Sequence, residues 1–382
     1  MSTITTHVSF HSPVFPFPTK SCVRKTVYCA YMATSSTFTP PIHSTTTVDD
    51  CGTTTLSAVH PDIIQTNILT RLDGPTLASA ACTSSQLYAL SSEENLWTNI
   101  CNSTWPSTKT LRLLQVISTF PNGSRSFFSD SFPLLTNSDS TPAANYSSLN
   151  PKYHPTELVS AIDVYYKGKV VFCKVIETET VTEWFQRSPF RLDLLDPKDV
   201  VPTPIRFNGG EEICRELADD LTLSWILIDP NGRRAVNLSS HKAVSVERHW
   251  LSGDVHIRFV TILAGKRGTA SELVQCGIVV TCGGSEGGEL LVREVSLQVE
   301  DMDAMHLNGK DSLVILKRSL EGAKVRRGRR ELDEGRKRYQ EYLERKKERK
   351  ERRLRTEGAL DMLCMAFGVL VFSGFWLYVL CR

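Results

Sequence analysis

Short runs of alternating hydrophobic and polar residues occupy the middle of the chain, from about residue 155 to residue 320. Alternation with a period of two places successive side chains on opposite faces of a strand. Turn residues separate the runs, as at Lys167-Gly168 and Asn231-Gly232. The strands are predicted within 161–177, 221–229, 255–263, 273–282 and 290–301. Because no long helix intervenes, the pattern predicts an antiparallel β-rich domain, a sandwich or a barrel.

A helical period is found earlier in the chain, within residues 60–101. Ile64, Ile68 and Leu72 recur at every fourth position, so a first helix would carry them as one apolar stripe. Gly74 is expected at the C-terminal cap of that helix, because the proline that follows it cannot continue the helix.

Two further short helices are predicted directly after the first. Thr76 is expected to cap a second helix that contains Leu77 and continues to Leu87. Ser91 and Glu94 have the Ser-x-x-Glu spacing of a capping box, which predicts the start of a third helix. Three helices in about forty residues cannot bury much apolar surface by themselves. We therefore expect this small module to have a docking face.

The C-terminus is a long apolar stretch. Residues Met362–Leu380 are 19 consecutive residues without a charge. As a helix with a rise of about 1.5 Å per residue the stretch would be roughly 28 Å long, close to the hydrocarbon thickness of about 30 Å. It has no polar face, so we assign residues 359–382 to a transmembrane tail anchor. The alternative is a buried C-terminal helix of the globular domain.

The preceding residues, 321–358, are predicted to form a charged helical stalk. Between residues 324 and 357 there are 16 basic and 8 acidic side chains. Opposite charges at helical spacing, as in Glu348 with Arg352, favour a solvated helix. The positive excess would keep this segment on the cytosolic side, where anionic lipids attract it. A nuclear localisation signal at 325–330 is an alternative, whereas the absence of accompanying stacking aromatics argues against a nucleic-acid partner.

Two segments have the composition of unfolded chain. Residues 1–54 are rich in Ser, Thr and Pro, and the first acidic residue is Asp49, which predicts a disordered leader. Such a composition is also typical of an organellar transit peptide, and Met32 could be an internal start. Residues 106–154 are predicted to be a linker.

Composition limits the class of protein. A chain of 382 residues with 41% hydrophobic and 23% charged residues is long enough for about two globular domains plus tails. The net charge of +2 combines the basic stalk with a mildly acidic remainder. The 11 cysteines include no Cys-x-x-Cys pair, which favours reduced thiols over a disulfide framework or a metal site.

Candidate catalytic chemistry is sparse. The segment Gly283–Gly288 is rich in glycine but lacks the Lys-Ser/Thr ending of a phosphate-binding loop. His241, His249 and His256 have no cysteine or carboxylate at ligand or triad spacing. We therefore predict no active site, no cofactor and no metal.

The segment from His60 to Cys101 resembles an F-box. The pattern of that family is a Leu-Pro entry, an Ile-Leu pair, a Leu that opens the second helix and a terminal Leu-Trp. It is met here by Pro61, Ile68, Leu69, Leu72, Leu77, Leu96 and Trp97. The chain departs from the pattern at His60, where the family has Leu, and at Ser84 and Ser85, where many members carry a basic pair.

A wider resemblance extends beyond this segment. Trp105 and the run 126–132 are similar to a group of plant F-box proteins that carry a β-rich C-terminal region. This resemblance implies an α+β chain with a three-helix F-box module at 55–105, a linker and an antiparallel, sandwich-like domain at 155–320. The charged helix and the C-terminal transmembrane helix follow.

The resemblance also implies a function. F-box proteins join a Skp-type adaptor and a cullin scaffold to a protein substrate for ubiquitination, and they are not themselves enzymes. The implied adaptor-binding residues are Pro61, Ile64, Ile68, Leu69, Leu72, Leu77, Leu96 and Trp97. The β-rich domain would recognise the substrate, and the bulk of the chain would lie in the cytosol at a membrane surface, with nucleus or cytoplasm as the alternative.

A second function class is compatible with the same sequence. The chain could be a tail-anchored interaction or ligand-binding protein that does not enter a ligase. The positions of Trp225 and Trp250 among the strands are similar to phloem-lectin-like domains attached to other plant F-box proteins. Binding of a Skp-type adaptor separates the two hypotheses.

Overall fold

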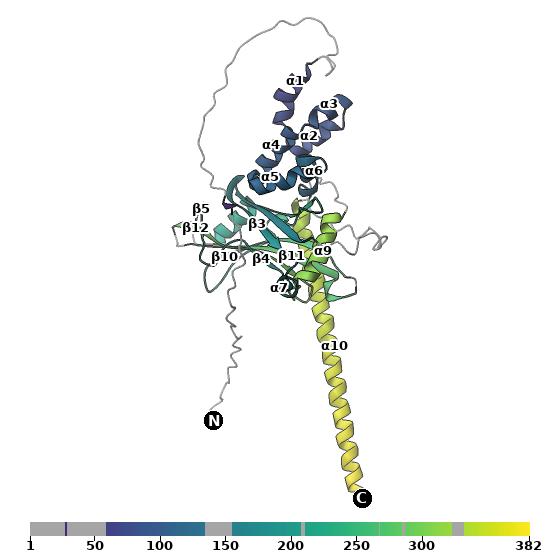
Figure 1. Cartoon of the computed structure of the whole chain (residues 1–382). Coiled ribbons are helices and arrows are strands. Elements are labelled where there is room, and N and C mark those ends of the chain that lie inside the picture. Colours follow the sequence, from purple (N-terminus) through teal and green to yellow (C-terminus); the bar gives the residue numbers. More distant parts are fainter. Residues whose placement is uncertain are drawn as a thin grey trace, which may run out of the picture.

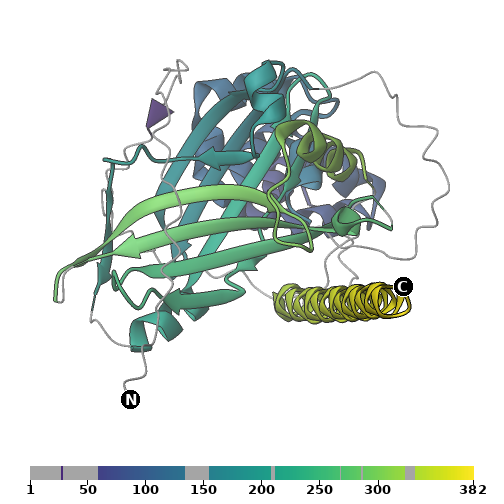
Figure 2. The same ribbon diagram turned by 90° about the horizontal axis from the view of Figure 1, so that it is seen from below.

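The computed structural model describes residues 27–28, 59–133, 155–207, 211–266, 268–284, 287–322 and 332–382. Over these ranges the chain forms an α+β structure in layers: a helical module, two antiparallel sheets and a long C-terminal helix (Figures 1 and 2). The predicted fold class is confirmed. The predicted disordered leader and internal start lie outside the described residues, apart from the two-residue strand β1 (Val27–Tyr28).

The helical module spans residues 61–131. Its segments are α1 (Pro61–Ile63), η2 (Ile64–Ile68), η3 (Leu69–Arg71), α2 (Gly74–Ala81), α3 (Ser85–Ser91), α4 (Glu94–Thr104), η4 (Pro106–Lys109), α5 (Leu111–Ser118) and α6 (Gly123–Ser131).

Side-chain caps set helix boundaries that differ from the predicted ones. The Asp73 carboxylate accepts a hydrogen bond from the Thr76 amide at 3.0 Å, so Gly74 begins α2 instead of ending the first helix. The Ser84 hydroxyl accepts from the Leu87 amide at 3.2 Å and starts α3, so the expected second helix is divided in two. Aspartate and serine are strong N-caps because a short side-chain oxygen reaches the amides of the first turn.

The predicted capping box is wrong. Ser91 is the last residue of α3, and its hydroxyl donates to the Tyr88 carbonyl at 3.1 Å. The Glu94 carboxylate accepts from the Ser124 amide at 2.7 Å, so it binds α6 instead of capping its own helix. Ser124, which is distant in sequence, has therefore replaced the expected partner of Glu94 at the start of its own helix.

The predicted linker is also wrong over residues 106–131, because η4, α5 and α6 lie there. Leu113, Val116 and Ile117 have the spacing of one helix face and are buried, as are Phe127 and Phe128 of α6. The four serines of α6 made this part of the chain read as a polar connector.

Both sheets are antiparallel. Sheet 1 contains β2 (Glu157–Tyr166), β3 (Lys169–Glu179), β6 (Leu221–Asp229), β7 (Arg234–Asn237) and β8 (His241–Lys242), in the order β1-β3-β2-β6-β7 with β8 also paired to β6. Sheet 2 contains β4 (Arg191–Asp193), β5 (Val201–Arg206), β9 (Ser245–Arg248), β10 (Val255–Ala264), β11 (Leu273–Gly283) and β12 (Glu289–Glu300), in the order β4-β12-β11-β10-β9 with β5 also paired to β12.

Short helices complete the sandwich. They are α7 (Glu183–Arg187), α8 (Glu211–Asp220), η5 (Ala270–Glu272) and α9 (Gly309–Glu321). The five predicted strand regions are all confirmed as strands, and the first of them is the β2–β3 hairpin. Lys167 and Gly168 form its two-residue turn with φ of 49° and 74°, which explains why a glycine follows the lysine.

The central strand β6 is buried on both faces. Leu223, Trp225 and Leu227 belong to the core between the two sheets, whereas Ile226 and Ile228 belong to the core shared with the helical module. Because successive side chains of a strand point to opposite faces, β6 contributes side chains to two different cores. A strand buried on both faces reads in sequence as a nearly continuous apolar run, which Leu221–Asp229 is.

The long helix α10 (Leu332–Leu380) begins in the charged segment and continues through the uncharged one. Its side chains Tyr339 and Tyr342 are buried with Val244 and Val260, on the outer side of sheet 2. The expectation of a fully solvated stalk is therefore wrong for its first turns, because two aromatic residues dock it onto the sandwich. The expected ion pair Glu348–Arg352 is present at 3.1 Å, and Glu351–Arg355 at 3.7 Å has the same spacing.

Buried polar contacts join η4 to sheet 1. The Asp163 carboxylate on β2 accepts from the Ser107 amide at 2.9 Å and from the Ser107 hydroxyl at 2.6 Å. The Trp105 indole donates to the Ser224 hydroxyl at 3.3 Å. Burial raises the pKa of Asp163 to about 7, and the two hydrogen bonds from Ser107 oppose that rise.

We predict that Asp163→Ala lowers the free energy of unfolding by about 1–3 kcal/mol, because it leaves two buried donors without an acceptor. Asp163→Asn keeps an acceptor and should cost less. Denaturant unfolding of the full chain in detergent measures both changes.

The pH dependence of the same contact has a definite sign. The folded pKa of Asp163 lies above the unfolded value, so its contribution to stability is fully present below about pH 4 and is lost as the pH rises through about 7. Relative to Asp163→Asn, the wild-type chain should therefore become less stable over this interval. A difference that stays constant with pH would contradict the buried, protonated carboxyl.

Candidate functional site

The first helical segment, α1 to η3, is the candidate docking site. Its start is set by His60, whose ring nitrogen accepts from the Asp62 amide at 3.3 Å, and by Pro61 in the first turn, where a missing amide costs nothing. The residues that follow do not continue as a regular α-helix. η2 is a π-type turn, in which the Leu69 amide donates to the Ile64 carbonyl five residues earlier.

The π-type turn changes which residues share a face. Ile64 and Leu69 are five apart and both point inward, with 0% and 1% of their surface exposed. Ile63 and Ile68 are also five apart and both point outward, with 50% and 44% exposed. The predicted stripe of every fourth residue therefore does not exist as one face.

The structure divides the eight predicted adaptor-binding residues into two groups. Pro61 and Ile68 are exposed, and Leu72 is half-buried. The other five lie in the core of the helical module: Ile64, Leu69, Leu77, Leu96 and Trp97. Sequence reasoning missed Ile63, and an i, i+5 pairing was the signal that could have found it. We define the docking surface as Pro61, Ile63 and Ile68.

The buried group holds this surface in place. The Trp97 indole donates to the Ser91 carbonyl at 2.7 Å, and its ring packs 5.5 Å from that of Phe128. The ring of Phe128 lies so close to Gly74 that a Cβ there would be 2.1 Å from it. Gly74 is thus required at the start of α2 by a close approach across the module.

The docking surface contains no reactive group. Its three side chains are apolar, and they can contribute only burial of hydrophobic surface against a partner. Elsewhere, burial raises the pKa of Cys101, Cys276 and Cys282 to about 12, so these thiols are poor nucleophiles at neutral pH. Within the residues that the structure describes, no three His, Cys, Asp or Glu side chains are grouped as a metal site.

The histidines of the sandwich have ordinary partners. The His249 and His256 rings are 5.7 Å apart, His249 lies 3.1 Å from the Ser252 hydroxyl, and His256 lies 3.2 Å from the Thr281 hydroxyl. Each ring contacts a hydroxyl group, but among the described residues neither histidine is paired with a carboxylate that would orient it as the base of a catalytic triad.

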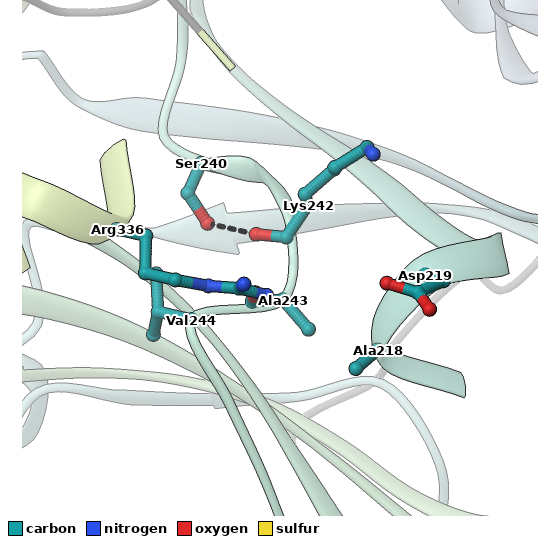
Figure 3. Close-up of a pocket in the computed structure, with 7 residues that line it drawn as sticks. All are labelled: Ala218, Asp219, Ser240, Lys242, Ala243, Val244 and Arg336. Carbon is teal, nitrogen blue, oxygen red and sulfur yellow. Dashed lines mark hydrogen bonds between the residues drawn. The ribbon is translucent and has the colours of Figure 1, made fainter. Parts of the chain in front are cut away.

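A small polar cavity of about 120 Å³ lies where α8, β8 and α10 meet (Figure 3). Its lining residues are Ala218, Asp219, Ser240, Lys242, Ala243, Val244 and Arg336. The Ser240 hydroxyl donates to the Lys242 carbonyl at 2.7 Å, and the Arg336 guanidinium donates to the Ala243 carbonyl at 3.2 Å. The first contact is local, whereas the second joins α10 to the residue after β8, so the cavity lies at a junction that helps to hold α10.

Comparison with known proteins agrees with the resemblance of the first segment. The F-box-like family matches residues 61–103. The Arabidopsis thaliana protein named "Probable F-box protein At2g36090" is 48% identical over 343 residues, which cover 89% of this chain and 96% of that protein. The Arabidopsis thaliana F-box proteins At2g27310 and At3g44326 are 44% and 41% identical, over 88% and 84% of this chain and 99% and 89% of their own lengths. No solved structure is significantly similar to the chain.

The two faces of the first segment should respond differently to truncation. Leu69→Ala removes a fully buried side chain and should lower the free energy of unfolding by about 2–5 kcal/mol. Ile68→Ala removes a half-exposed one and should change it by about 1 kcal/mol or less. Thermal or denaturant unfolding of the two variants tests the π-type turn directly, since a regular α-helix that buries Ile64 would also bury Ile68 four residues later and make its truncation costly.

Proposed function

Because this chain belongs to the family of F-box proteins, we propose that it is the substrate-recognition subunit of an SCF-type cullin-RING ubiquitin ligase. Proteins of the family are generally non-catalytic adaptors. The helical module would bind a Skp-type adaptor, and the β-sandwich would bind a protein substrate. The ligase chemistry would belong to other subunits, and this chain would contribute proximity.

One observation carries the proposal: the exposed, apolar docking surface lies in the segment of the module that matches the family. Pro61, Ile63 and Ile68 lie outside the packed interior, although nearby apolar residues such as Ile64 and Leu69 are buried. Exposed apolar side chains on such a small module favour a protein partner. The segment that carries them also lies within the family match at 61–103.

The shared core supports the assignment of substrate recognition to the sandwich. The docking surface and the sandwich belong to one packed structure, because the module is buried against Ile226 and Ile228 of sheet 1. A substrate bound on the sandwich would consequently keep a defined position relative to the adaptor. Such fixed positioning is what a proximity mechanism needs.

Adaptor binding provides the test. The double variant Ile63→Ala and Ile68→Ala should weaken binding to a Skp-type adaptor by about thirtyfold or more, because buried apolar anchors often contribute 2 kcal/mol or more to an interface. Titration calorimetry with purified adaptor measures the loss. Leu111→Ala, at an exposed leucine on α5, is the matched control and should bind normally.

Adaptor binding by the unmodified chain distinguishes a ligase subunit from a binding protein that does not enter a ligase. If it forms no complex with the adaptor at micromolar concentration by gel filtration, the ligase assignment fails and the second function class replaces it.

We further propose that the C-terminal part of α10 anchors the chain in a membrane. Among the described residues, one helix contains a window apolar enough to span a bilayer, with a mean hydropathy of 2.1 and none of it buried. The side chains from Met362 to Leu380 are all exposed, so a buried core helix does not account for them. An exposed apolar surface of this kind is unfavourable in water and favourable in lipid.

Charges placed in the centre of this segment test the anchor. Leu370→Arg with Val371→Arg should move the full chain from the membrane pellet to the supernatant after carbonate extraction, because each central arginine costs roughly 2.5 kcal/mol or more. Leu370→Ala with Val371→Ala is the control and should stay in the pellet. An unmodified chain that is extracted by carbonate would refute the anchor.

A further inference from the structure

The helix α10 connects the body of the protein, which comprises the helical module and the sandwich, to the proposed anchor. Within the described part of the chain, its last hydrogen-bonded contact with the body is the ion pair of the half-buried Arg349 with Asp303 at 3.0 Å. From Lys350 onward every side chain of the helix is exposed. The uncharged run begins at Met362, thirteen residues after Arg349. At about 1.5 Å per residue, this distance along the helix is about 20 Å.

The segment between body and anchor, residues 350–361, is built to remain helical in water. Three ion pairs at i, i+4 spacing support it: Glu348–Arg352 at 3.1 Å, Glu351–Arg355 at 3.7 Å and Arg353–Glu357 at 2.9 Å. An isolated helix of this length would be marginal, because starting a helix is costly. Here the helix is already formed on the body side and continues into the apolar run, so that cost does not arise.

Attraction to anionic lipid does not pull this segment flat onto the bilayer. Residues 350–361 contain four basic and three acidic side chains. The charges are thus nearly balanced, and most of the basic excess of the charged segment lies before residue 350, because residues 324–349 contain 12 basic and 6 acidic side chains. The charged side chains next to the anchor stabilise the helix by pairing with one another more than they attract it to a lipid surface.

The contacts of α10 also set which end of the body faces the anchor. Along the helix, Arg336 bonds to Ala243, Tyr342 to Asp301 and Arg349 to Asp303, so the turn at 301–306 lies nearest the C-terminus. The same end carries α7, which is joined to the start of α9 by a backbone hydrogen bond from Gly309 to Ser188 at 3.0 Å. Figure 1 shows α7 on the side of the body toward the C-terminus, with α1 and α3 at the opposite side.

We propose that residues 350–361 are a rigid spacer. They hold the body about 20 Å from the bilayer, with the α7 end toward the membrane and the docking surface away from it. The inference rests on the proposed anchor and adds a substrate class. Partners that reach the α7 end are confined to a thin layer next to the membrane, and they are the cytosolic segments of proteins embedded in the same bilayer.

Energy transfer to labelled lipid tests the spacer. The full chain would be reconstituted in phosphatidylcholine vesicles that contain a lipid-linked acceptor dye, with a fluorescent amino acid at Gln186 on α7 or at Ser85 on α3. Both positions are exposed. We expect clearly stronger transfer from position 186 than from position 85. Equal transfer from the two positions would overturn the proposed orientation.

Changes within the spacer give the second arm of the test. An insertion of seven helix-forming residues after Arg355 adds about two turns, or about 10 Å, and should reduce transfer from both positions while their order is kept. Arg353→Pro with Leu354→Gly interrupts the helix and should abolish the difference between the positions. Leu354→Ala preserves the helix and should leave both values unchanged.

These outcomes separate the spacer from the anchor. An insertion without effect, or a helix-breaking variant that behaves like the unmodified chain, overturns the spacer. Carbonate extraction of the same vesicles reports on the anchor alone, so a chain that is washed off identifies a failure of the proposed function and not of the spacer.

Discussion

Sheet 1 has no solvent-facing side along its central strands, and the rest of the structure depends on this constraint. One row of its side chains, including Trp225, closes the core between the two sheets, and the other row, including Ile226, closes the core of the helical module. Burial of apolar surface is the dominant favourable term in folding. Neither the helical module nor the sandwich therefore completes its core without the other.

Buried polar contacts specify how the two parts meet. Among the described residues the Asp163 carboxyl is hydrogen-bonded by Ser107 alone, and Tyr165 donates its hydroxyl to the Thr104 carbonyl. A shifted packing would therefore leave buried groups without partners. Apolar contact alone would tolerate some sliding between helices and sheet. The combination fixes the docking surface relative to the sandwich, which is the geometry that an adaptor acting by proximity requires.

The long helix extends the same arrangement beyond the body. Tyr339 and Tyr342 pack against Val244 and Val260, and the Tyr342 hydroxyl donates to the Asp301 carbonyl at 3.1 Å. Two aromatic residues in a segment otherwise rich in charge thus turn a solvated helix into a docked one. The direction of α10, and with it the direction of the proposed anchor, follows from this small contact.

The sequence by itself determined the features that depend on neighbouring residues. The predicted strands, the turn at Lys167-Gly168, the apolar C-terminal helix and the F-box resemblance all follow from local periods and turn chemistry. Tertiary structure alone decided the features that depend on distant partners. Glu94 binds Ser124 instead of capping its own helix, residues 106–131 fold onto sheet 1 instead of forming a linker, and a π-type turn exposes Ile63 while it buries Ile64. The physical reason is that a local pattern marks which residues are apolar, whereas the surface they are buried against is supplied by parts of the chain far away in sequence.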